Sequence, residues 1–381
     1  MIPANHQACV AIIAGEASGD QHGAKLITAM QKKNPALFFC GIGGPAMKQA
    51  GVRILMDASE LTVVGITEVF AKLPAILKGM RTMKRLLNSL KPDLLILIDF
   101  PDFNLHIAAA AKKLGIPVLY YISPQIWAWR RGRVRQIARC VDCMAVILPF
   151  EEQFYAENDV KATFVGHPLL DSPLPPADQV LAGGGEGPVT IGLMPGSRDT
   201  EITRHLSIML DSARILKDRL KQVTFLVSHA PSVAREQIDM IIAGHPSRMA
   251  VEIVSDGVET VFKRSDLVVA ASGTVTLQAA IHGAPMVIMY KVSPISFLLG
   301  RVLVRVSHIG LVNLVAGREL VPEFVQGAAS AENIASAVET MLTDRHHLHQ
   351  LKQQLLALRD VLGGGGASDR VAGLALEMLG S

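Results

Sequence analysis

The sequence Asp266-Leu-Val-Val-Ala-Ala-Ser-Gly-Thr-Val-Thr-Leu-Gln278 contains an apolar run that stops at Ser272-Gly273-Thr274 and continues into a helix-forming stretch. Strands that are buried on both faces of a parallel sheet have continuous apolar runs of this kind. The unpaired backbone N–H groups at the start of the next helix favour phosphate, and the Ser and Thr hydroxyls add donors. The segment therefore predicts a parallel α/β sheet with a phosphate-binding turn.

A second turn of the same kind follows the apolar run Thr190–Met194. Pro195-Gly196-Ser197-Arg198 ends this predicted strand, and a helical pattern with Glu201 follows it. Either turn alone is also typical of an ordinary strand-to-helix connection. Because two such turns occur in one half of the chain and Arg198 adds a positive charge, we expect them to hold the diphosphate of a nucleotide.

The composition is that of a globular protein, and the length favours two domains. The chain has 381 residues, of which 50% are hydrophobic and 19% are charged, and its formal net charge is +3. Such a chain can bury sizeable cores and is not disordered. A small excess of positive charge without a concentrated basic face predicts no nucleic-acid partner.

The chain has four cysteines, Cys9, Cys40, Cys140 and Cys143. The N-terminus lacks the basic and apolar regions of a signal peptide, so we expect a reducing, cytoplasmic environment. The single CxxC pair is better explained by packing on a helix than by zinc, which needs four ligands. The uncharged run Leu267–Tyr290 is long enough to span a bilayer, but its turn residues divide it into strand, helix and strand.

Apolar strand-like runs alternate with helical stretches in two successive series. The runs are Cys9–Ala14, Asp93–Ile98, Val118–Ile122 and Met144–Leu148 in the first series, and Val189–Met194, Val223–Val227, Leu267–Ala271 and Met286–Met289 in the second. This alternation predicts two parallel α/β sheets. Segments rich in proline and glycine, Pro173–Pro176 and Gly183–Pro188, lie between the two series and predict a linker.

The expected domains are an N-terminal α/β domain over residues 1–172, a linker over 173–188, a C-terminal α/β domain over 189–343 and C-terminal helices over 344–381. The last helices either pack back on the first domain or are exchanged within a homodimer. Ligands of open α/β sheets bind outside the carboxyl ends of the strands, so we expect the two domains to face a cleft. The second domain is expected to hold the nucleotide and the first the other reactant.

Two acidic motifs in the first half follow predicted strands. The first, Gly15-Glu-Ala-Ser-Gly-Asp-Gln-His-Gly23, carries Glu16, Ser18, Asp20 and His22 on a glycine-rich turn that does not match the dinucleotide-binding fingerprint. The second is Asp99-Phe-Pro-Asp-Phe-Asn104, in which Asp102 and Asn104 are suited to capping the next helix. Asp102 is therefore interpreted as structural and Asp99 as the better candidate for a base, whereas the first motif also fits a tight turn with solvated side chains.

Both tryptophans of the chain lie in Ser123-Pro-Gln-Ile-Trp-Ala-Trp-Arg-Arg131. This loop is interpreted either as a platform beside arginines that bind an anion or an acidic lipid surface, or as a buried aromatic hinge. His167, in Gly166-His-Pro168, fits a structural hydrogen bond as well as a ligand.

Seven motifs together resemble the lipid-A-disaccharide synthase family over nearly the full length of the chain. They are Gly15-Glu-Ala-Ser-Gly-Asp20, Ile98-Asp-Phe-Pro-Asp-Phe-Asn104, Ser123-Pro-Gln-Ile-Trp-Ala-Trp129, Gly166-His-Pro168, Pro195-Gly-Ser-Arg198, Ala271-Ser-Gly-Thr274 and Asn313-Leu-Val-Ala-Gly-Arg-Glu-Leu-Val-Pro-Glu-Phe-Val-Gln326.

The resemblance implies an inverting glycosyltransferase of the GT-B fold, with two Rossmann-like parallel-sheet domains that face a cleft. Such an enzyme joins UDP-2,3-diacylglucosamine to 2,3-diacylglucosamine 1-phosphate (lipid X) and releases UDP, in the lipid A pathway of Gram-negative bacteria. The resemblance also implies roles for individual residues. The diphosphate would be held by Ser197, Arg198, Ser272, Gly273 and Thr274, the donor would be surrounded by Asn313, Glu323 and Gln326, and Ser18 would contact substrate.

One position departs from the family pattern, because Gln278 stands where the family usually has Glu at a place that grips ribose hydroxyls. An amide still hydrogen-bonds a diol, so weaker nucleotide binding is expected rather than loss of activity. No Asp-x-Asp sequence lies near either turn, so we expect no metal and no cofactor. The acceptor hydroxyl needs a base, either Asp99 or Glu16, with His22 assisting or orienting Glu16.

Both substrates are acylated, so the enzyme is expected to lie peripherally on the anionic inner membrane. The stretch Leu61–Leu87 has the pattern of an interfacial helix, with ordinary core packing as the alternative. Its expected membrane contacts are Val64, Val69, Phe70, Leu73, Leu77, Lys72 and Arg81. A similar pattern occurs in Pro294–Val306, where Arg301 and Arg305 lie opposite Phe297 and Leu298.

Two other functions share part of these features. An enzyme of the UDP-N-acetylglucosamine 2-epimerase type would share the nucleotide half but needs no acyl-binding surface. A non-catalytic nucleotide-sugar or lipid-binding protein is compatible with Gln278 but leaves Glu16, Asp99 and Arg198 unexplained. Release of UDP from the two acylated sugars distinguishes the three.

Overall fold

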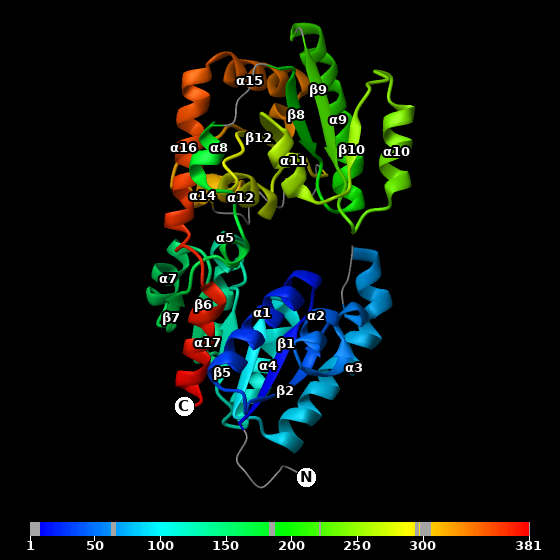
Figure 1. Cartoon of the computed structure of the whole chain (residues 1–381). Coiled ribbons are helices and arrows are strands. Elements are labelled where there is room, and N and C mark those ends of the chain that lie inside the picture. Colours follow the sequence, from blue (N-terminus) through cyan, green and yellow to red (C-terminus); the bar gives the residue numbers. More distant parts are fainter. Residues whose placement is uncertain are drawn as a thin grey trace. The chain divides into compact units, whose positions relative to one another are not determined.

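The chain forms two compact units, which are described separately (Figure 1). The computed structural model describes residues 8–61, 66–182, 187–220, 222–293, 297 and 306–380, and only the backbone of residues 66–73. The first unit comprises Met1–Ser172 and Leu362–Ser381, and the second comprises Pro173–Val361.

The first unit contains a parallel sheet of seven strands in the order β3-β2-β1-β4-β5-β6-β7. The strands are β1 (Cys9–Ala14), β2 (Phe38–Gly43), β3 (Arg53–Asp57), β4 (Leu94–Ile98), β5 (Val118–Tyr121), β6 (Cys143–Val146) and β7 (Ala162–Phe164). The connecting helices are α1 (Ala17–Lys33), α2 (Pro45–Gln49), α3 (Ile66–Leu90), α4 (Pro101–Lys113), α5 (Ile126–Trp129), α6 (Val134–Cys140) and α7 (Pro149–Ala156).

Two apolar cores cover the two faces of this sheet, because successive residues of a strand point to opposite faces. Val10, Ile12 and Ala14 of β1 pack with Leu26 and Ile27 of α1. The intervening Ala11 and Ile13 belong to the core beneath α3, α4 and α6. Burial of each large aliphatic side chain stabilises the fold by roughly 1.5–3 kcal/mol, which explains why β4 is apolar at every position.

The second unit repeats this architecture with six parallel strands in the order β10-β9-β8-β11-β12-β13. The strands are β8 (Val189–Met194), β9 (Val223–Ser228), β10 (Glu252–Val254), β11 (Leu267–Ala271), β12 (Met286–Tyr290) and β13 (Glu323–Val325). The helices are α8 (Ala177–Ala182), α9 (Asp199–Arg219), α10 (Arg235–Gly244), α11 (Val258–Arg264), α12 (Thr274–Ile281), α14 (Leu311–Ala316), α15 (Ala331–Thr343) and α16 (Arg345–Val361). Two parallel α/β sheets, as predicted from the alternating pattern, are therefore confirmed.

The last helix, α17 (Ala367–Met378), returns to the first unit and packs on α1. Its apolar residues Val371, Ala372 and Ala375 join the core on the β1 face. The chain first passes from one unit to the other after Ser172. The stretch after this point, residues 173–188, was expected to be a linker, but it contains α8 and belongs to the second unit.

In both sheets the chain order reverses at one point, which is where open α/β sheets bind their ligands. In the first unit this point lies between β1 and β4, where Ala14 is in register with Ile98. In the second unit it lies between β8 and β11, where Met194 is in register with Ala270. The residues that follow these four strands are therefore the first place to look for a site.

Candidate active site

The two predicted phosphate turns of the second unit line one pocket. Its volume is about 290 Å³. The residues that line it include Ser197, Arg198, Ser272, Gly273, Thr274 and Gln278. They converge because β8 and β11 are neighbours, so the turns after Met194 and Ala271 lie side by side at the carboxyl edge of the sheet.

Glu201 binds the hydrogen-bond donors of the turn Pro195–Arg198. Its Oε2 accepts a hydrogen bond of 3.0 Å from the backbone N–H of Ser197, and its Oε1 lies 3.2 Å from Nη1 of Arg198. A Cβ atom at Gly196 would stand 2.4 Å from Oε2 of Glu201, and Gly196 has φ of +122°, so only glycine fits there. The turn therefore already holds a carboxylate, which shows that its donors suit an anionic oxygen.

Asn313 and Glu323 support the second turn through the segment Ile309–Gly310. Glu323 accepts hydrogen bonds from the N–H groups of Ile309 and Gly310, at 2.8 and 3.0 Å, and one of 2.7 Å from Nδ2 of Asn313. The Ser272 hydroxyl in turn donates to the carbonyl of Ile309 at 2.7 Å. These polar side chains bind the protein itself, so their role in the structure is to fix the turn.

Gln326 and His205 hydrogen-bond to loops at the carboxyl edge of the second sheet. The Gln326 amide pairs with both backbone groups of Val292. His205, which is fully buried, bridges the carbonyl of Pro195 and the N–H of Lys291. Sequence reasoning missed His205, because a lone histidine on a helix carries no signal of the two loops that it joins.

Asp99 stands at the reversal point of the first sheet, directly after β4. Burial raises the pKa of its carboxyl from 3.8 to about 6, and the nearby charge of Glu16 adds to the rise. A carboxylate with a raised pKa accepts a proton more readily while it is still ionised at neutral pH. Among the acidic residues of this turn, Asp99 is thus the one whose surroundings favour a base.

The backbone around Asp99 is held in an unusual conformation. Asp99 and Phe100 have φ of +46° and +49°, which is rare for residues other than glycine. The carbonyl of Asp99 accepts hydrogen bonds of 2.6 Å from Nδ2 of Asn104 and of 2.6 Å from the hydroxyl of Tyr120. A Cβ atom at Gly15 would stand 2.3 Å from the Phe100 ring, so the turn after β1 needs glycine to admit that ring.

The glycine-rich turn after β1 places its polar residues differently. Glu16 and Ser18 are exposed at the start of α1. Asp20 is buried and accepts hydrogen bonds from the N–H groups of Gly44, Ala46 and Met47, so it caps α2 and is structural. Burial, followed by the charge of Lys25, lowers the pKa of His22 to about 4, so this ring is neutral at physiological pH.

The two tryptophans have different environments. Trp127 is buried, and its indole N–H donates to Oε1 of Glu151 at 2.9 Å. Burial raises the pKa of Glu151 to about 7. Trp129 is 45% exposed, and the Arg130 guanidinium lies 4.1 Å from its ring centre. The loop thus combines an anchored aromatic ring with an exposed one beside arginines.

His167 and Asp102, two further residues of the predicted motifs, bind neighbouring parts of the first unit. Nδ1 of His167 accepts a hydrogen bond from the N–H of Leu169, and burial lowers its pKa to about 4. Asp102 does not cap α4 but pairs with Arg130 and Arg133.

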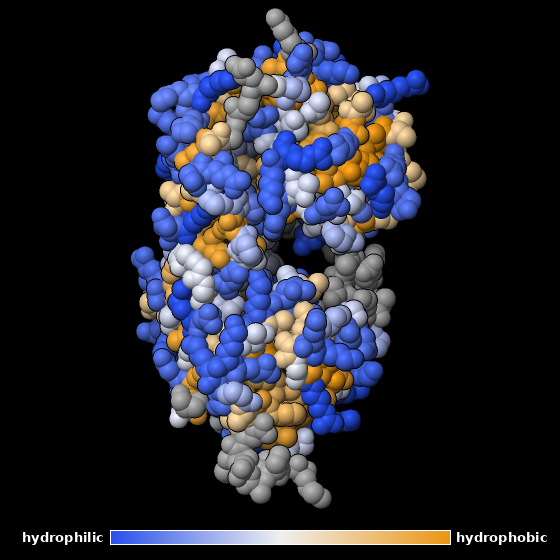
Figure 2. All heavy atoms as spheres, in the orientation of Figure 1, coloured by the Kyte–Doolittle hydropathy of each residue, from blue (hydrophilic) through white to orange (hydrophobic). Residues whose placement is uncertain are grey.

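The predicted membrane contacts are only partly described. Val64 lies outside the described residues, as do the side chains of Val69, Phe70, Lys72 and Leu73. Leu77 and Arg81 are exposed on α3. Of the second stretch, Leu298, Arg301 and Arg305 lie outside the described residues. The surface in Figure 2 is largely hydrophilic, with hydrophobic side chains in patches, and no helix among the described residues has the length and apolar character to cross a membrane.

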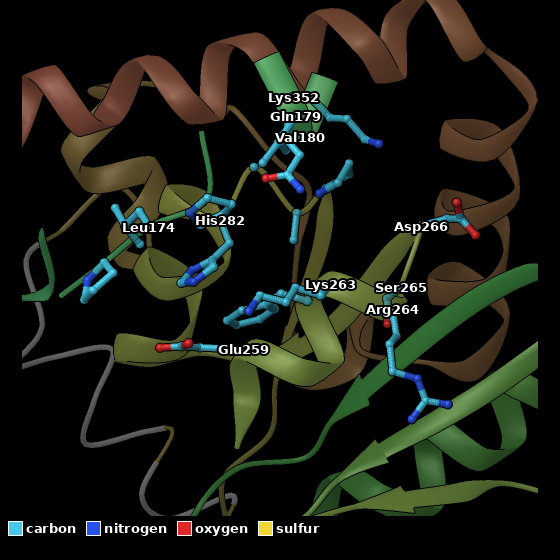
Figure 3. A pocket seen from close by; sticks show the side chains of 16 residues that line it. Leu174, Gln179, Val180, Glu259, Lys263, Arg264, Ser265, Asp266, His282 and Lys352 are labelled. Carbon is cyan, nitrogen blue, oxygen red and sulfur yellow. The ribbon is translucent and has the colours of Figure 1, made fainter. Parts of the chain in front are cut away.

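A larger cavity, of about 720 Å³, lies at the other end of the second sheet (Figure 3). Its lining includes Lys263 of α11, His282 after α12, and Ser265 and Asp266 before β11. These residues come before β11 and β12 in the chain and therefore lie at the amino-terminal edge of the sheet. The phosphate turns lie at the opposite, carboxyl edge. Among the described residues, no three His, Cys, Asp or Glu side chains are grouped as a metal site requires.

Solved structures of other proteins share this fold. The UDP-GlcNAc 2-epimerase from Neisseria meningitidis bound to UDP-GlcNAc aligns with a TM-score of 0.65 at 13% identity, over 97% of this chain and 100% of that one. MurG from Acinetobacter baumannii aligns with a TM-score of 0.59 at 16% identity, over 97% and 99%. At such identities the likeness shows the fold alone, which is that of GT-B proteins.

Sequence comparison identifies the family. A family model described as lipid-A-disaccharide synthetase matches residues 10–364. A lipid-A-disaccharide synthase from Geobacter metallireducens is 48% identical over 377 residues, which cover 97% of each protein. One from Syntrophus aciditrophicus is 47% identical over 375 residues, again covering 97% of each. The chain therefore belongs to the lipid-A-disaccharide synthase family.

Proposed function

We propose that this chain transfers the diacylglucosaminyl group of UDP-2,3-diacylglucosamine to 2,3-diacylglucosamine 1-phosphate, with inversion at the anomeric carbon. The chain has the lipid-A-disaccharide synthase activity of its family, a glycosyl transfer in lipid A biosynthesis. The detailed proposal rests on where the candidate residues lie in the two sheets. Candidate residues follow both central strands of each sheet, Asp99 and Glu16 in the first and the two phosphate turns in the second.

The second unit is assigned the donor. The pocket between the two turns collects the backbone N–H groups at the start of α12, the Ser and Thr hydroxyls and Arg198. As the glycosidic bond to UDP breaks, its electron pair moves to the β-phosphate oxygen, so negative charge grows there. The donors that line the pocket would stabilise this charge on the departing UDP, with Arg198 exchanging its ion pair with Glu201 for the phosphate.

The first unit is assigned the acceptor and the base. The acceptor hydroxyl loses its proton to the Asp99 carboxylate while its oxygen forms the new bond to the anomeric carbon, opposite to UDP. With a pKa of about 6, Asp99 is still mostly ionised at neutral pH and is a better proton acceptor than an ordinary aspartate. General-base help of this kind contributes about 10²–10⁴ in rate.

The test is release of UDP from the two acylated sugars by the wild-type protein. We expect turnover with both sugars present and none when either is omitted. Arg198→Ala should raise the donor KM and lower kcat, and Arg198→Lys should restore only part of both, because lysine lacks the planar pair of donors. A protein that binds UDP but releases none from the donor would overturn the proposal.

For the membrane, the proposal is that α3 and the residues before it lie on an anionic lipid surface at the cytoplasmic side. Leu77 is 42% exposed and is accompanied by exposed Lys78 and Arg81, a combination typical of interfacial helices. Each basic residue near anionic lipid contributes about 1 kcal/mol, and buried apolar area adds roughly 25 cal/mol per Å².

Replacement of Val69, Phe70 and Leu73 by serine should release the protein from anionic vesicles and raise the KM for the acylated acceptor, with UDP affinity unchanged. Leu55→Ser is the control, because Leu55 is 39% exposed on β3, outside this stretch. If the triple variant unfolds and the wild type binds no vesicles at low salt, the stretch is part of the core.

A further inference from the structure

Two arginines converge on one carboxylate oxygen near the proposed base. Nη1 of Arg130 lies 3.6 Å from Oδ1 of Asp102, and Arg133 forms an ion pair with the same oxygen. Arg130 directly follows α5, Arg133 directly precedes α6, and Asp102 lies in the first turn of α4. Two positive charges thus share one negative charge, and an excess of one positive charge remains.

This cluster is held in place by its surroundings. The Arg130 guanidinium lies 4.1 Å from the ring centre of Trp129, and such cation–π contacts restrict the arginine. The side chain of Arg133 is only 24% exposed. The loop itself is anchored by the buried bond between Trp127 and Glu151. Exposed ion pairs contribute only about 0–1 kcal/mol to stability, so stability alone does not account for this arrangement.

The position of the cluster suits one end of the acceptor. Asp102 follows Asp99 by three residues, a separation of at most about 10 Å along the chain. An acceptor whose hydroxyl contacts Asp99 would have to span a distance of this order to bring its phosphate to the arginines at Asp102. The N-terminus of α4, a helix of 13 residues, adds partial positive charge on the same side.

We propose that Arg130 and Arg133 bind the phosphate of the acceptor sugar. The inference rests on the proposed function, in which the acceptor is a sugar 1-phosphate. A phosphate dianion offsets the excess positive charge more fully than Asp102 does, and the planar guanidinium groups match its oxygens. Asp102 holds the two arginines together, so the site is assembled before the acceptor arrives.

The experiment compares two acceptors, diacylglucosamine with and without its 1-phosphate, presented in the same detergent. The measured quantity is the ratio of kcat/KM for the two. The wild type should favour the phosphorylated sugar, and Arg133→Ala and Arg130→Ala should each reduce that preference by about 10- to 100-fold, as expected for lost hydrogen bonds to a charged group. The KM for the UDP donor should stay within about twofold.

Arg135→Ala is the matched control, because Arg135 is exposed on α6 and has no ion pair or hydrogen bond among the described residues. It should leave the preference unchanged. A wild type that uses both acceptors equally, or arginine variants that lose activity on both acceptors alike, would overturn the phosphate site while leaving the proposed function intact.

A second readout separates the phosphate of the acceptor from the phosphates of a bilayer. Binding of Arg130→Ala and Arg133→Ala to anionic vesicles without acceptor should match that of the wild type. Loss of vesicle binding without any change in acceptor preference would identify a lipid headgroup contact and overturn the proposal. Absence of UDP release by the wild type with either acceptor would instead count against the proposed function.

Discussion

At the scale of single residues, Asp99 is the strongest candidate for the base. We predict that Asp99→Asn, which keeps the size but removes the basicity, lowers kcat by about 10²-fold or more. UDP affinity, measured by calorimetry, should change little because the phosphate turns belong to the second unit. Turnover near the wild-type level would move the role to Glu16, and Glu16→Gln is the variant to compare.

The raised pKa of Asp99 predicts how activity and stability depend on pH. Wild-type kcat should fall as pH drops through about 6, the pKa of Asp99 in the folded protein. Because this pKa is raised above the ordinary 3.8, the folded state binds a proton more readily than the unfolded state, and stability falls as pH rises from about 4 to about 6. Asp99→Asn should therefore increase the free energy of unfolding by about 1–3 kcal/mol at pH 8 and by little at pH 4. Urea unfolding at the two pH values checks the difference.

Gln278 lies on α12 and lines the pocket with both phosphate turns. We predict that Gln278→Glu tightens UDP binding by several-fold, because a carboxylate accepts hydrogen bonds from two ribose hydroxyls more strongly than an amide does. Calorimetry with UDP measures the change. Equal or weaker affinity in the variant would show that this position does not contact the ribose.

At the scale of elements, the turns after β1 and β4 are locked together by the Phe100 ring over Gly15. We predict that Gly15→Ala displaces this ring, costs about 1–3 kcal/mol of stability through overpacking and lowers kcat by moving Asp99. Thermal unfolding and steady-state kinetics on the same preparation measure both effects. The control is Gly244→Ala at the end of α10 in the second unit, because a Cβ atom at Gly244 meets nothing within 4 Å. This variant should change neither quantity. A Gly15→Ala protein with normal kcat would show that Asp99 does not depend on the Phe100 ring.

The central strands of the two sheets were predictable from sequence, whereas β2, β3 and the three-residue strands were not. Continuous apolar runs mark β1, β4, β8 and β11, because these strands are buried on both faces. Strands β7, β10 and β13 have three residues each and carry no periodic pattern. They form because a longer neighbour offers unpaired backbone groups, which is a tertiary effect.

The same limit applies to the site. The positions of the two turns and of Asp99 were predictable, because these residues directly follow apolar strands, and their roles in binding and catalysis stay predictions. The actual contacts of Asn313 and Glu323 were not, because their bonds to Ile309 and Gly310 depend on how a separate loop returns to the sheet. The pairing of Asp102 with Arg130 and Arg133 likewise joins segments about 30 residues apart along the chain.

At the scale of the whole molecule, the first unit is built from two separated pieces of chain. The start of α17 is bound by Asp171, which lies in the segment Pro168–Asp171 after β7. The Asp171 carboxylate accepts hydrogen bonds from the N–H groups of Gly366, Ala367 and Ser368 and from the Ser368 hydroxyl. Burial alone would raise the pKa of Asp171, but these hydrogen bonds together lower it below its usual value. The carboxylate therefore stabilises the fold at neutral pH, and this contribution is lost as pH falls through the lowered pKa.

We predict that Asp171→Ala destabilises the first unit by about 1–2 kcal/mol, the usual cost of removing a helix cap, because the first N–H groups of α17 lose their acceptor. Asp369→Ala is the control, since Asp369 is exposed in the first turn of the same helix. Denaturant unfolding gives the free energy, and calorimetry should show unchanged UDP affinity, because the proposed UDP pocket lies in the second unit. If Asp171→Ala weakens UDP binding as much as it weakens the fold, then the second unit depends on the return of α17, and the two units do not fold as separate bodies.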